Sequence, residues 1–198
     1  MKRIYLKTLC GTIITALAFA GSVRAASDTG TVEKKPSAGA TKSEQGKLDR
    51  HDESFLKQAA EINLTEIALG KAAEHSSDAH VKKIGQMLVK DHSEANRNLE
   101  RLAASKGVSL PTEPSLWDRH SIHSIEKEQG DKFNKEFLSF NQKGHEKAIS
   151  LFEKESARTQ DPDIKAWAQK MVPSLKEHLA MAQKPESVAE KSKGKTKH

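Results

Sequence analysis

The sequence predicts an all-α fold: an antiparallel four-helix bundle with a kinked last helix and disordered termini. Apolar residues recur at helical spacing in four long segments, and no segment alternates in the way that a half-buried β-strand does. The connections near residues 76 and 159 are short, as they are between antiparallel neighbours in a bundle. Residues 48–183 of the 198-residue chain are enough for one hydrophobic core, so we expect a single bundle domain there.

Residues 1–25 are typical of a secretory signal peptide. A positively charged start, MKRIYLK, precedes the apolar run TLCGTIITALAFAG, and Val23 and Ala25 are the small residues of a cleavage site before Ala26. The apolar run is too short for a permanent membrane anchor. We therefore expect an exported, periplasmic protein with no transmembrane segment after signal cleavage.

Two polar segments flank the expected bundle. Residues 26–47 predict a disordered leader, and residues 184–198 predict a lysine-rich disordered tail. The net charge of +6 comes from the signal and these two segments, which leaves the bundle region slightly acidic. Without a basic face we expect no nucleic-acid partner. The tail lysines suit either a cell-envelope or protein partner, or a solubilising role.

The first two helices are placed by their caps. The first helix is expected to begin near Asp52 as its N-cap, and the second to follow a cap at Ser76 or Ser77. Gly107 is a natural end for the second helix. The expected apolar stripes are Phe55, Ala59, Ile62, Leu69 and Ala73, then Val81, Ile84, Leu88, Ala95, Leu99 and Leu102.

The second half of the domain holds two more long helices. A short polar helix is expected within residues 115–129, and Asp131 opens the third long helix. The sequence Asp-Pro-Asp at 161–163 starts the fourth, with a proline in its first turn. Pro173 lies inside that helix and predicts the kink, because proline lacks a backbone donor. The apolar stripes are Phe133, Phe137, Phe140, Ala148, Leu151 and Phe152, then Ile164, Trp167, Ala168, Met171, Leu175 and Leu179.

Several kinds of chemistry are excluded. The only cysteine, Cys10, leaves with the signal, so the mature chain has no disulfide, thiolate metal site or cysteine nucleophile. There is no Gly-rich phosphate loop, no Gly-x-Ser-x-Gly elbow and no HExxH pair. We assign no catalytic and no cofactor-binding residues, and we favour a protein that is not an enzyme.

Each long helix carries one polar, metal-competent residue within its apolar stripe. These residues are Glu66, His92, His145 and His178. With a rise of ~1.5 Å per residue, His92, His145 and His178 lie ~24, ~21 and ~28 Å from the end that carries the turns near 76 and 159, and Glu66 lies ~15 Å from it. The three histidines can therefore share a layer, whereas Glu66 is expected a turn or more away.

Three interpretations of these residues are open. The favoured one is a structural polar layer, in which the histidines hydrogen-bond across helices and a buried Glu66 pairs with one of them. The second is a transition-metal site for Zn or Fe, with Glu66 or Asp91 assisting the histidines. The third is a small-ligand pocket. A ferritin-type di-iron site is disfavoured because no histidine has a glutamate three residues before it.

A second histidine pair occurs in the short helix. His120 and His123 are spaced i, i+3, with Trp117 one turn earlier. Adjacent imidazoles can chelate a metal, but we expect this pair to be solvated surface.

The segments EIALGKAA, VKDH and PSLKEHL, in that order, closely resemble a family of exported bacterial proteins, the domain of unknown function family 4142. The resemblance extends over residues 52–182, and members are often labelled outer membrane proteins. It implies export and a ferritin-like four-helix fold, and it supplies no reaction. We therefore expect an exported helical-bundle protein, a non-catalytic binding or envelope stress-related protein. The alternative is a metal-binding or metal-dependent redox protein that uses the inward histidines.

Overall fold

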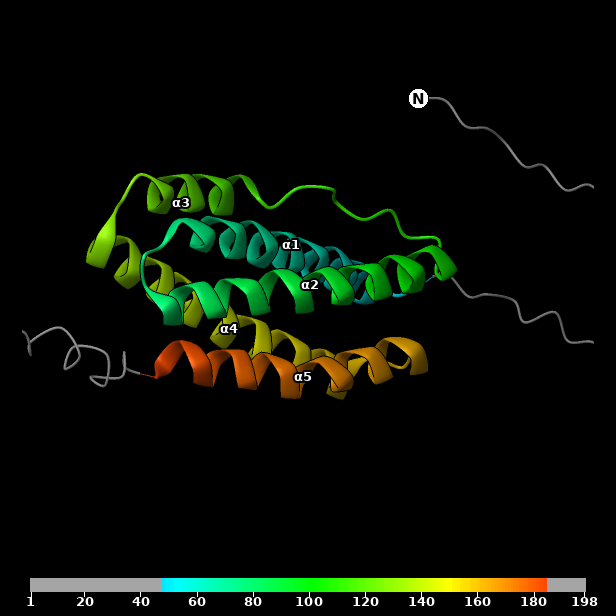
Figure 1. Cartoon of the computed structure of the whole chain (residues 1–198). Coiled ribbons are helices and arrows are strands. Elements are labelled where there is room, and N and C mark those ends of the chain that lie inside the picture. The colour runs from blue at the N-terminus through cyan, green and yellow to red at the C-terminus, as the bar shows by residue number, and fades with distance from the viewer. Residues whose placement is uncertain (1–47, 185–198) are drawn as a thin grey trace, which may run out of the picture. The chain divides into compact units, whose positions relative to one another are not determined.

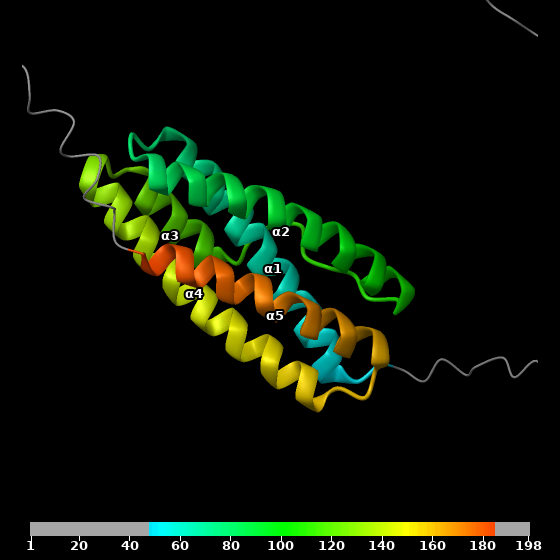
Figure 2. The ribbon, with the colours of Figure 1, turned by 60° about the horizontal axis from the view of Figure 1, so that its bottom comes forward.

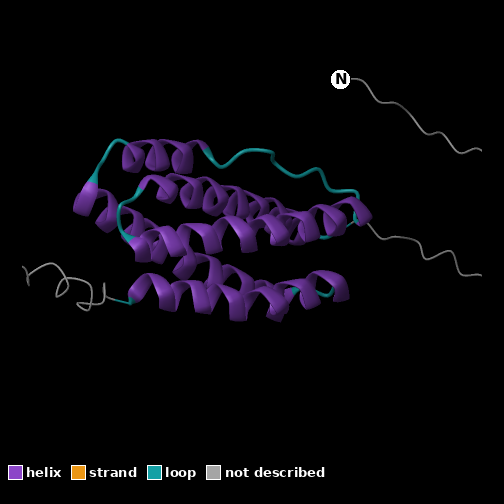
Figure 3. Ribbon diagram, viewed as in Figure 1, coloured by secondary structure: helices purple, strands orange, loops and turns teal. Residues whose placement is uncertain are grey.

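The computed structural model describes residues 48–184, and all their regular structure is helical (Figure 3). The elements are α1 (Arg50–Ala72), the 3₁₀ turn η1 (Ala73–His75), α2 (Ala79–Ser105), α3 (Leu116–Glu126), α4 (Gly130–Arg158) and α5 (Pro162–Gln183). The all-α prediction is therefore confirmed. The expected signal peptide and leader, and all of the tail after Lys184, lie outside the described residues.

The four long helices form two hairpins that pack together. Helix α1 packs along α2, α4 packs along α5, and contacts between α1 and α4 and between α2 and α5 join the two hairpins (Figures 1 and 2). The link after α2 returns along the outside to the short helix α3, which rests on α1 and α4 (Figure 1). Each long helix thus has one face toward the shared interior.

The observed caps correct two of the predicted helix starts. Helix α1 begins after Asp49, whose carboxylate accepts a bond from the His51 amide, so the predicted cap at Asp52 is wrong. Helix α2 is capped by Asp78, which accepts a 2.8 Å bond from the Val81 amide, in place of the predicted Ser76 or Ser77. In each case an aspartate one turn or less from the predicted residue fits the first-turn amides.

Asp52 has a different task inside α1. Its buried carboxylate accepts a 3.0 Å bond from the Thr159 hydroxyl and pairs at 3.0 Å with Arg158. The same guanidinium also binds Glu155. Desolvation lowers the Arg158 pKa, but the hydrogen bond and the charge of Glu155 outweigh it, so the pKa is raised. This ion-pair group ties the start of α1 to the end of α4.

The later helix signals agree with the structure. Asp161 caps α5 by accepting bonds from the amides of Asp163 and Ile164, and α2 ends before Gly107, whose φ of 70° suits glycine. Helix α4 begins at Gly130, one residue before the predicted Asp131. Helix α5 continues through Pro173; the kink there stays a prediction.

A pair of glycines sets the contact between α1 and α2. A Cβ on Gly85 would lie 2.5 Å from the Ala73 Cβ and 2.7 Å from the Gly70 carbonyl oxygen. A Cβ on Gly70 would lie 2.7 Å from the Gly85 carbonyl oxygen. The two backbones therefore touch, and this close approach fixes the stagger of one helix against the other.

The interior has two apolar clusters with polar residues between them. One cluster contains Phe55, Leu99, Phe152, Ile164 and Leu175, and the other contains Leu69, Ile84, Leu88, Phe133 and Phe137. On each long helix, buried polar residues lie between the parts that contribute to the two clusters: Asn63 and Glu66, His92, Asn141 and His145, and His178. The candidate site is this polar layer.

Within residues 48–184, no helix has the length and apolarity needed to cross a membrane.

Candidate metal centre

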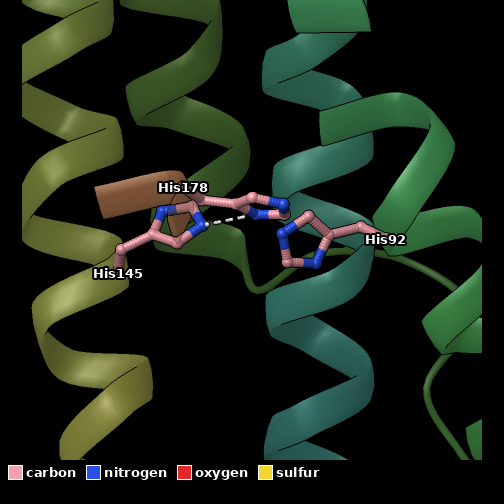
Figure 4. Close-up of side chains that lie close together, drawn as sticks. All are labelled: His92, His145 and His178. Carbon is pink, nitrogen blue, oxygen red and sulfur yellow. Dashed lines mark hydrogen bonds between the residues drawn. The ribbon is translucent and has the colours of Figure 1, made fainter. Parts of the chain in front are cut away.

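Three of the four predicted site residues meet in the interior. His92 comes from α2, His145 from α4 and His178 from α5, and all three side chains are buried (Figure 4). Their ring centroids are 5.3–5.7 Å apart. One ring nitrogen from each lies within 4.8 Å of the others, close enough for all three to bind one metal ion. The expectation that these histidines can share a layer is confirmed.

His145 is held by an acceptor on its outer side. Its Nδ1 lies 3.0 Å from the backbone carbonyl oxygen of Asn141, one turn earlier on α4. A carbonyl oxygen can only accept, so Nδ1 carries the proton and donates it. The Nε2 atom of the neutral ring then carries a free lone pair, which points into the cluster toward His178.

His178 is oriented by a carboxylate on a neighbouring helix. Its Nε2 lies 3.2 Å from the Asp91 carboxylate of α2 and 3.4 Å from the Ser174 hydroxyl. Nε2–H donates a hydrogen bond to Asp91, so Nδ1 of the neutral ring is unprotonated and carries a lone pair. This Nδ1 is 3.3 Å from Nε2 of His145 (dashed line in Figure 4).

His92 completes the set. Its Nδ1 lies 3.0 Å from the amide oxygen of Asn63 on α1, so Nδ1–H donates to that oxygen and Nε2 carries a free lone pair. The ring faces the other two histidines in Figure 4. Within residues 48–184, this buried Nε2 has no hydrogen-bond partner.

Burial keeps the three rings neutral. Desolvation is the largest cause that lowers the His92 pKa well below 6.5, and the neighbouring His145 and His178 lower it further. Desolvation also lowers the pKa of His145 to about 4, and it lowers that of His178 against the raising effect of Asp91. Neutral imidazole is the form that binds metals, so at neutral pH the three rings are in the protonation state that could hold an ion.

Glu66, the fourth predicted residue, is buried beside His145 rather than a turn away from it. Its Oε1 lies 3.5 Å from His145 Nδ1, and its Oε2 accepts a 3.0 Å bond from the Asn141 side chain. The expected distance of a turn or more is wrong because the depths were counted from a single end carrying both turns. In the structure the turns near 76 and 159 lie at opposite ends of the helices: Ser76 bonds to Asn134 near the start of α4, and Thr159 bonds to Asp52 near the start of α1 (Figure 1). Glu66 faces the outer nitrogen of His145, which also makes it a partner of that histidine, as the polar-layer interpretation expected.

Desolvation raises the Glu66 pKa to about 8, against the lowering effect of the Asn141 side chain. The carboxyl group is therefore largely protonated at neutral pH in the metal-free fold. A cation held by His145 would make its Nδ1–H a stronger donor and favour the ionised form of the neighbouring Glu66 carboxyl.

The residues that orient the histidines were not predicted as site residues, except for Asp91. Asn63 and Asn141 are fully buried, and both lie at helical spacing within apolar stripes, four residues from Ala59 and from Phe137 respectively. That spacing is the signal that could have found them. Asn63 Nδ2 and Asn141 Oδ1 have no hydrogen-bond partner within residues 48–184.

The other histidine pair does not join the cluster. His120 and His123 are exposed on α3, in agreement with the expected solvated surface, and His123 lies 3.9 Å from Glu126.

Comparison with known proteins supports the fold and leaves the chemistry open. No curated protein matches this chain. The chain resembles the crystal structure of a DUF305 fragment from Deinococcus radiodurans, with a TM-score of 0.61 and 13% sequence identity, over 68% of this chain and 94% of that one. At this identity the likeness concerns the fold alone.

A family model covers most of the chain. The domain of unknown function model DUF4142 matches residues 37–184, a range that includes every helix within residues 48–184 and the histidines His92, His145 and His178. The resemblance seen in EIALGKAA, VKDH and PSLKEHL is thereby confirmed. This protein belongs to the DUF4142 family.

Proposed function

We propose that this protein binds one divalent transition-metal ion between His92, His145 and His178, inside a ferritin-like four-helix bundle, after export to the periplasm. The two packed hairpins α1–α2 and α4–α5 support the bundle description. The short connections 76–78 and 159–161 fit antiparallel neighbours. The signal-like residues 1–25 support export.

One observation carries the metal proposal: each histidine has an acceptor on its outer nitrogen. The Asn141 carbonyl, the Asp91 carboxylate and the Asn63 amide oxygen hold the three protons outward. Three lone pairs therefore converge on one buried point. Metal-binding histidines usually donate their second N–H to a carbonyl or carboxylate in this way, which fixes the tautomer.

A purely structural polar layer fits this geometry less well. His145 Nε2 and His178 Nδ1 are 3.3 Å apart, and a hydrogen bond between them needs a proton on one of these nitrogens. That ring would then be doubly protonated, because its outer nitrogen already donates, and burial disfavours the cation. A metal ion bound by both lone pairs removes the conflict.

The ligand set favours zinc-like ions over iron. Three imidazoles with an open fourth position are a known zinc arrangement, whereas non-haem iron sites use two histidines and a carboxylate facing the metal. Glu66 faces the far side of His145. The chain's residues would hold the ion through neutral nitrogens, and Asp91 would supply nearby negative charge.

The test is to titrate Zn²⁺ into the metal-free protein that begins at Ala26 and to measure binding by calorimetry. Thermal unfolding is then compared with and without chelator. We expect one Zn²⁺ per chain and a melting temperature that rises with free zinc, because binding to the native state alone stabilises it. Co²⁺ in the same site should give the intense visible absorption of a tetrahedral ion.

His92→Gln and His178→Gln each remove one inward lone pair and should abolish the stoichiometric site. The matched control is His120→Gln, which removes an exposed imidazole. If the parent binds no zinc, or if all three variants bind it equally, the interior site is disproved. In that case the histidines are a structural layer.

Export and partners are proposed separately. Fractionation of the native host should place the processed chain in the periplasm, and retention of residues 1–25 would contradict export.

We also propose that residues 184–198, with five lysines, contact an anionic envelope component. Deleting them should abolish a salt-sensitive envelope association.

A further inference from the structure

A cavity opens between α1, α3 and α4, outside the histidine cluster. Its volume is about 570 Å³, within the range of small-molecule sites. Ile62, Phe140 and Leu151 form apolar parts of its wall, and Trp117 stands beside them with 77% of its surface exposed. An indole this exposed is uncommon on a monomer surface, and it offers a flat apolar face to a ligand.

The α4 side of the cavity carries two positive charges. Lys143 and Lys147 are one turn apart, and both line the cavity. Within residues 48–184, neither lysine forms an ion pair. The wall opposite α4 carries the acids Glu61 and Asp118, and Asp118 accepts bonds from the hydroxyls of Ser115 and Thr65. The α4 wall is therefore the positive side of the cavity, where an acidic head group can pair with the two lysines.

Gly144, between the two lysines, keeps the wall open. A Cβ at this position would come within 3.0 Å of the Glu66 carboxylate at the cavity floor. A glycine inside a helix costs about 1 kcal/mol relative to alanine. Its place beside the cavity indicates that space there matters.

We infer that this cavity binds an amphipathic organic anion, a molecule with an apolar, flat body and one acidic head group. The body packs on Trp117, Ile62 and Phe140, and the head group pairs with Lys143 and Lys147. The argument uses the cavity, the exposed indole and the two unpaired lysines, so it stands whether or not the histidines bind metal.

The test compares two probes that differ by one sulfonate group. These are the anion 8-anilinonaphthalene-1-sulfonate and its neutral parent N-phenyl-1-naphthylamine, each titrated into the folded chain from Ala26. We expect saturable binding of the anion, with energy transfer from tryptophan, and weaker binding of the neutral probe. Equal binding of the two, or no saturable binding of the anion, overturns the proposal.

Variants then place the probe. Lys143→Gln with Lys147→Gln should weaken binding of the anion about fivefold or more, as the loss of two partly exposed ion pairs implies, and leave the neutral probe unchanged. Trp117→Ala should weaken both probes and reduce the energy transfer, leaving only the part that Trp167 supplies. The control is Lys82→Gln with Lys83→Gln, which removes two exposed lysines of α2.

All variants are checked for native helicity before titration, because a loosened core binds such dyes without specificity. Anion binding that the Lys143/Lys147 and Trp117 variants leave unchanged overturns the assignment to this cavity.

Discussion

At the scale of single residues, the outer nitrogens of the histidines matter as much as the inner ones. Asn141, Asp91 and Asn63 each accept one N–H, and together they decide which nitrogen of each ring is free. Asp91 is the only one of these acceptors with a charge. It therefore offers the cleanest substitution for testing how orientation and charge around the site affect metal affinity.

We expect Asp91→Asn to weaken zinc binding by about tenfold, in the range seen when a partner of a ligating histidine is changed. The variant keeps an acceptor for His178 but loses the charge that favours a bound cation. Isothermal titration of Zn²⁺ measures the change, with Glu94→Gln, an exposed acid on the same helix, as the control. Unchanged affinity in Asp91→Asn would mean that Asp91 has no role at the site.

Glu66 should make the metal-free fold less stable as the pH rises. Its pKa is raised to about 8 in the fold, so its contribution is fully present below the unfolded pKa near 4.5 and is lost as the pH rises through 8. Glu66→Gln imitates the protonated acid. We expect it to be more stable than the parent at pH 8.5, by about 2 kcal/mol, and similar to it at pH 5.

Urea unfolding with chelator present measures both values. A Glu66→Gln variant that is less stable than the parent at pH 8.5 would show that the carboxylate is ionised in the fold and held by His145.

At the scale of elements, the α1–α2 hairpin depends on two glycines. We expect Gly85→Ala to destabilise the fold by about 1–3 kcal/mol, because the added methyl meets the Gly70 carbonyl and the Ala73 Cβ, and backbone atoms cannot move cheaply. Gly144→Ala is the comparison. Its methyl meets only the end of the Glu66 side chain at 3.0 Å, and helix propensity favours alanine.

Thermal unfolding of both variants decides the matter. Equal effects of Gly85→Ala and Gly144→Ala would contradict the idea that helix contact, rather than helix propensity, governs position 85.

At the scale of the whole molecule, the polar layer divides the core. The cluster around Phe55 and Phe152 lies on one side, and the cluster around Leu69 and Phe137 lies on the other. Each half has its own apolar contacts, so the layer between them is where the fold depends most on protonation.

We therefore expect the metal-free fold to lose stability as the pH falls below about 6.5. Unfolded histidines take up protons there, whereas the folded ones do not until much lower pH, about 4 for His145. The measurement is urea unfolding between pH 7 and pH 4.5 in the Glu66→Gln background, which removes the opposing titration of that residue. His145→Gln should make the slope shallower, and a flat profile in both would contradict the lowered pKa values.

The sequence by itself determined the all-α class, the approximate extent of the four long helices and the inward position of Glu66, His92, His145 and His178. These features follow from periodicity, caps and Pro162, which act within one helix. Glu66 shows the limit of such reasoning, because its depth was counted from a single end, whereas the turns near 76 and 159 lie at opposite ends.

Only the tertiary structure decided which side chains meet. The stagger between helices depends on contacts such as Gly70 against Gly85, and these are invisible to a pattern within one helix. Packing brought Asn63 to His92, Asp91 to His178 and Glu66 to His145. For His92 and His178, a hydrogen-bond partner on a neighbouring helix decides which ring nitrogen carries the lone pair. The direction of that lone pair is therefore a property of the packed helices.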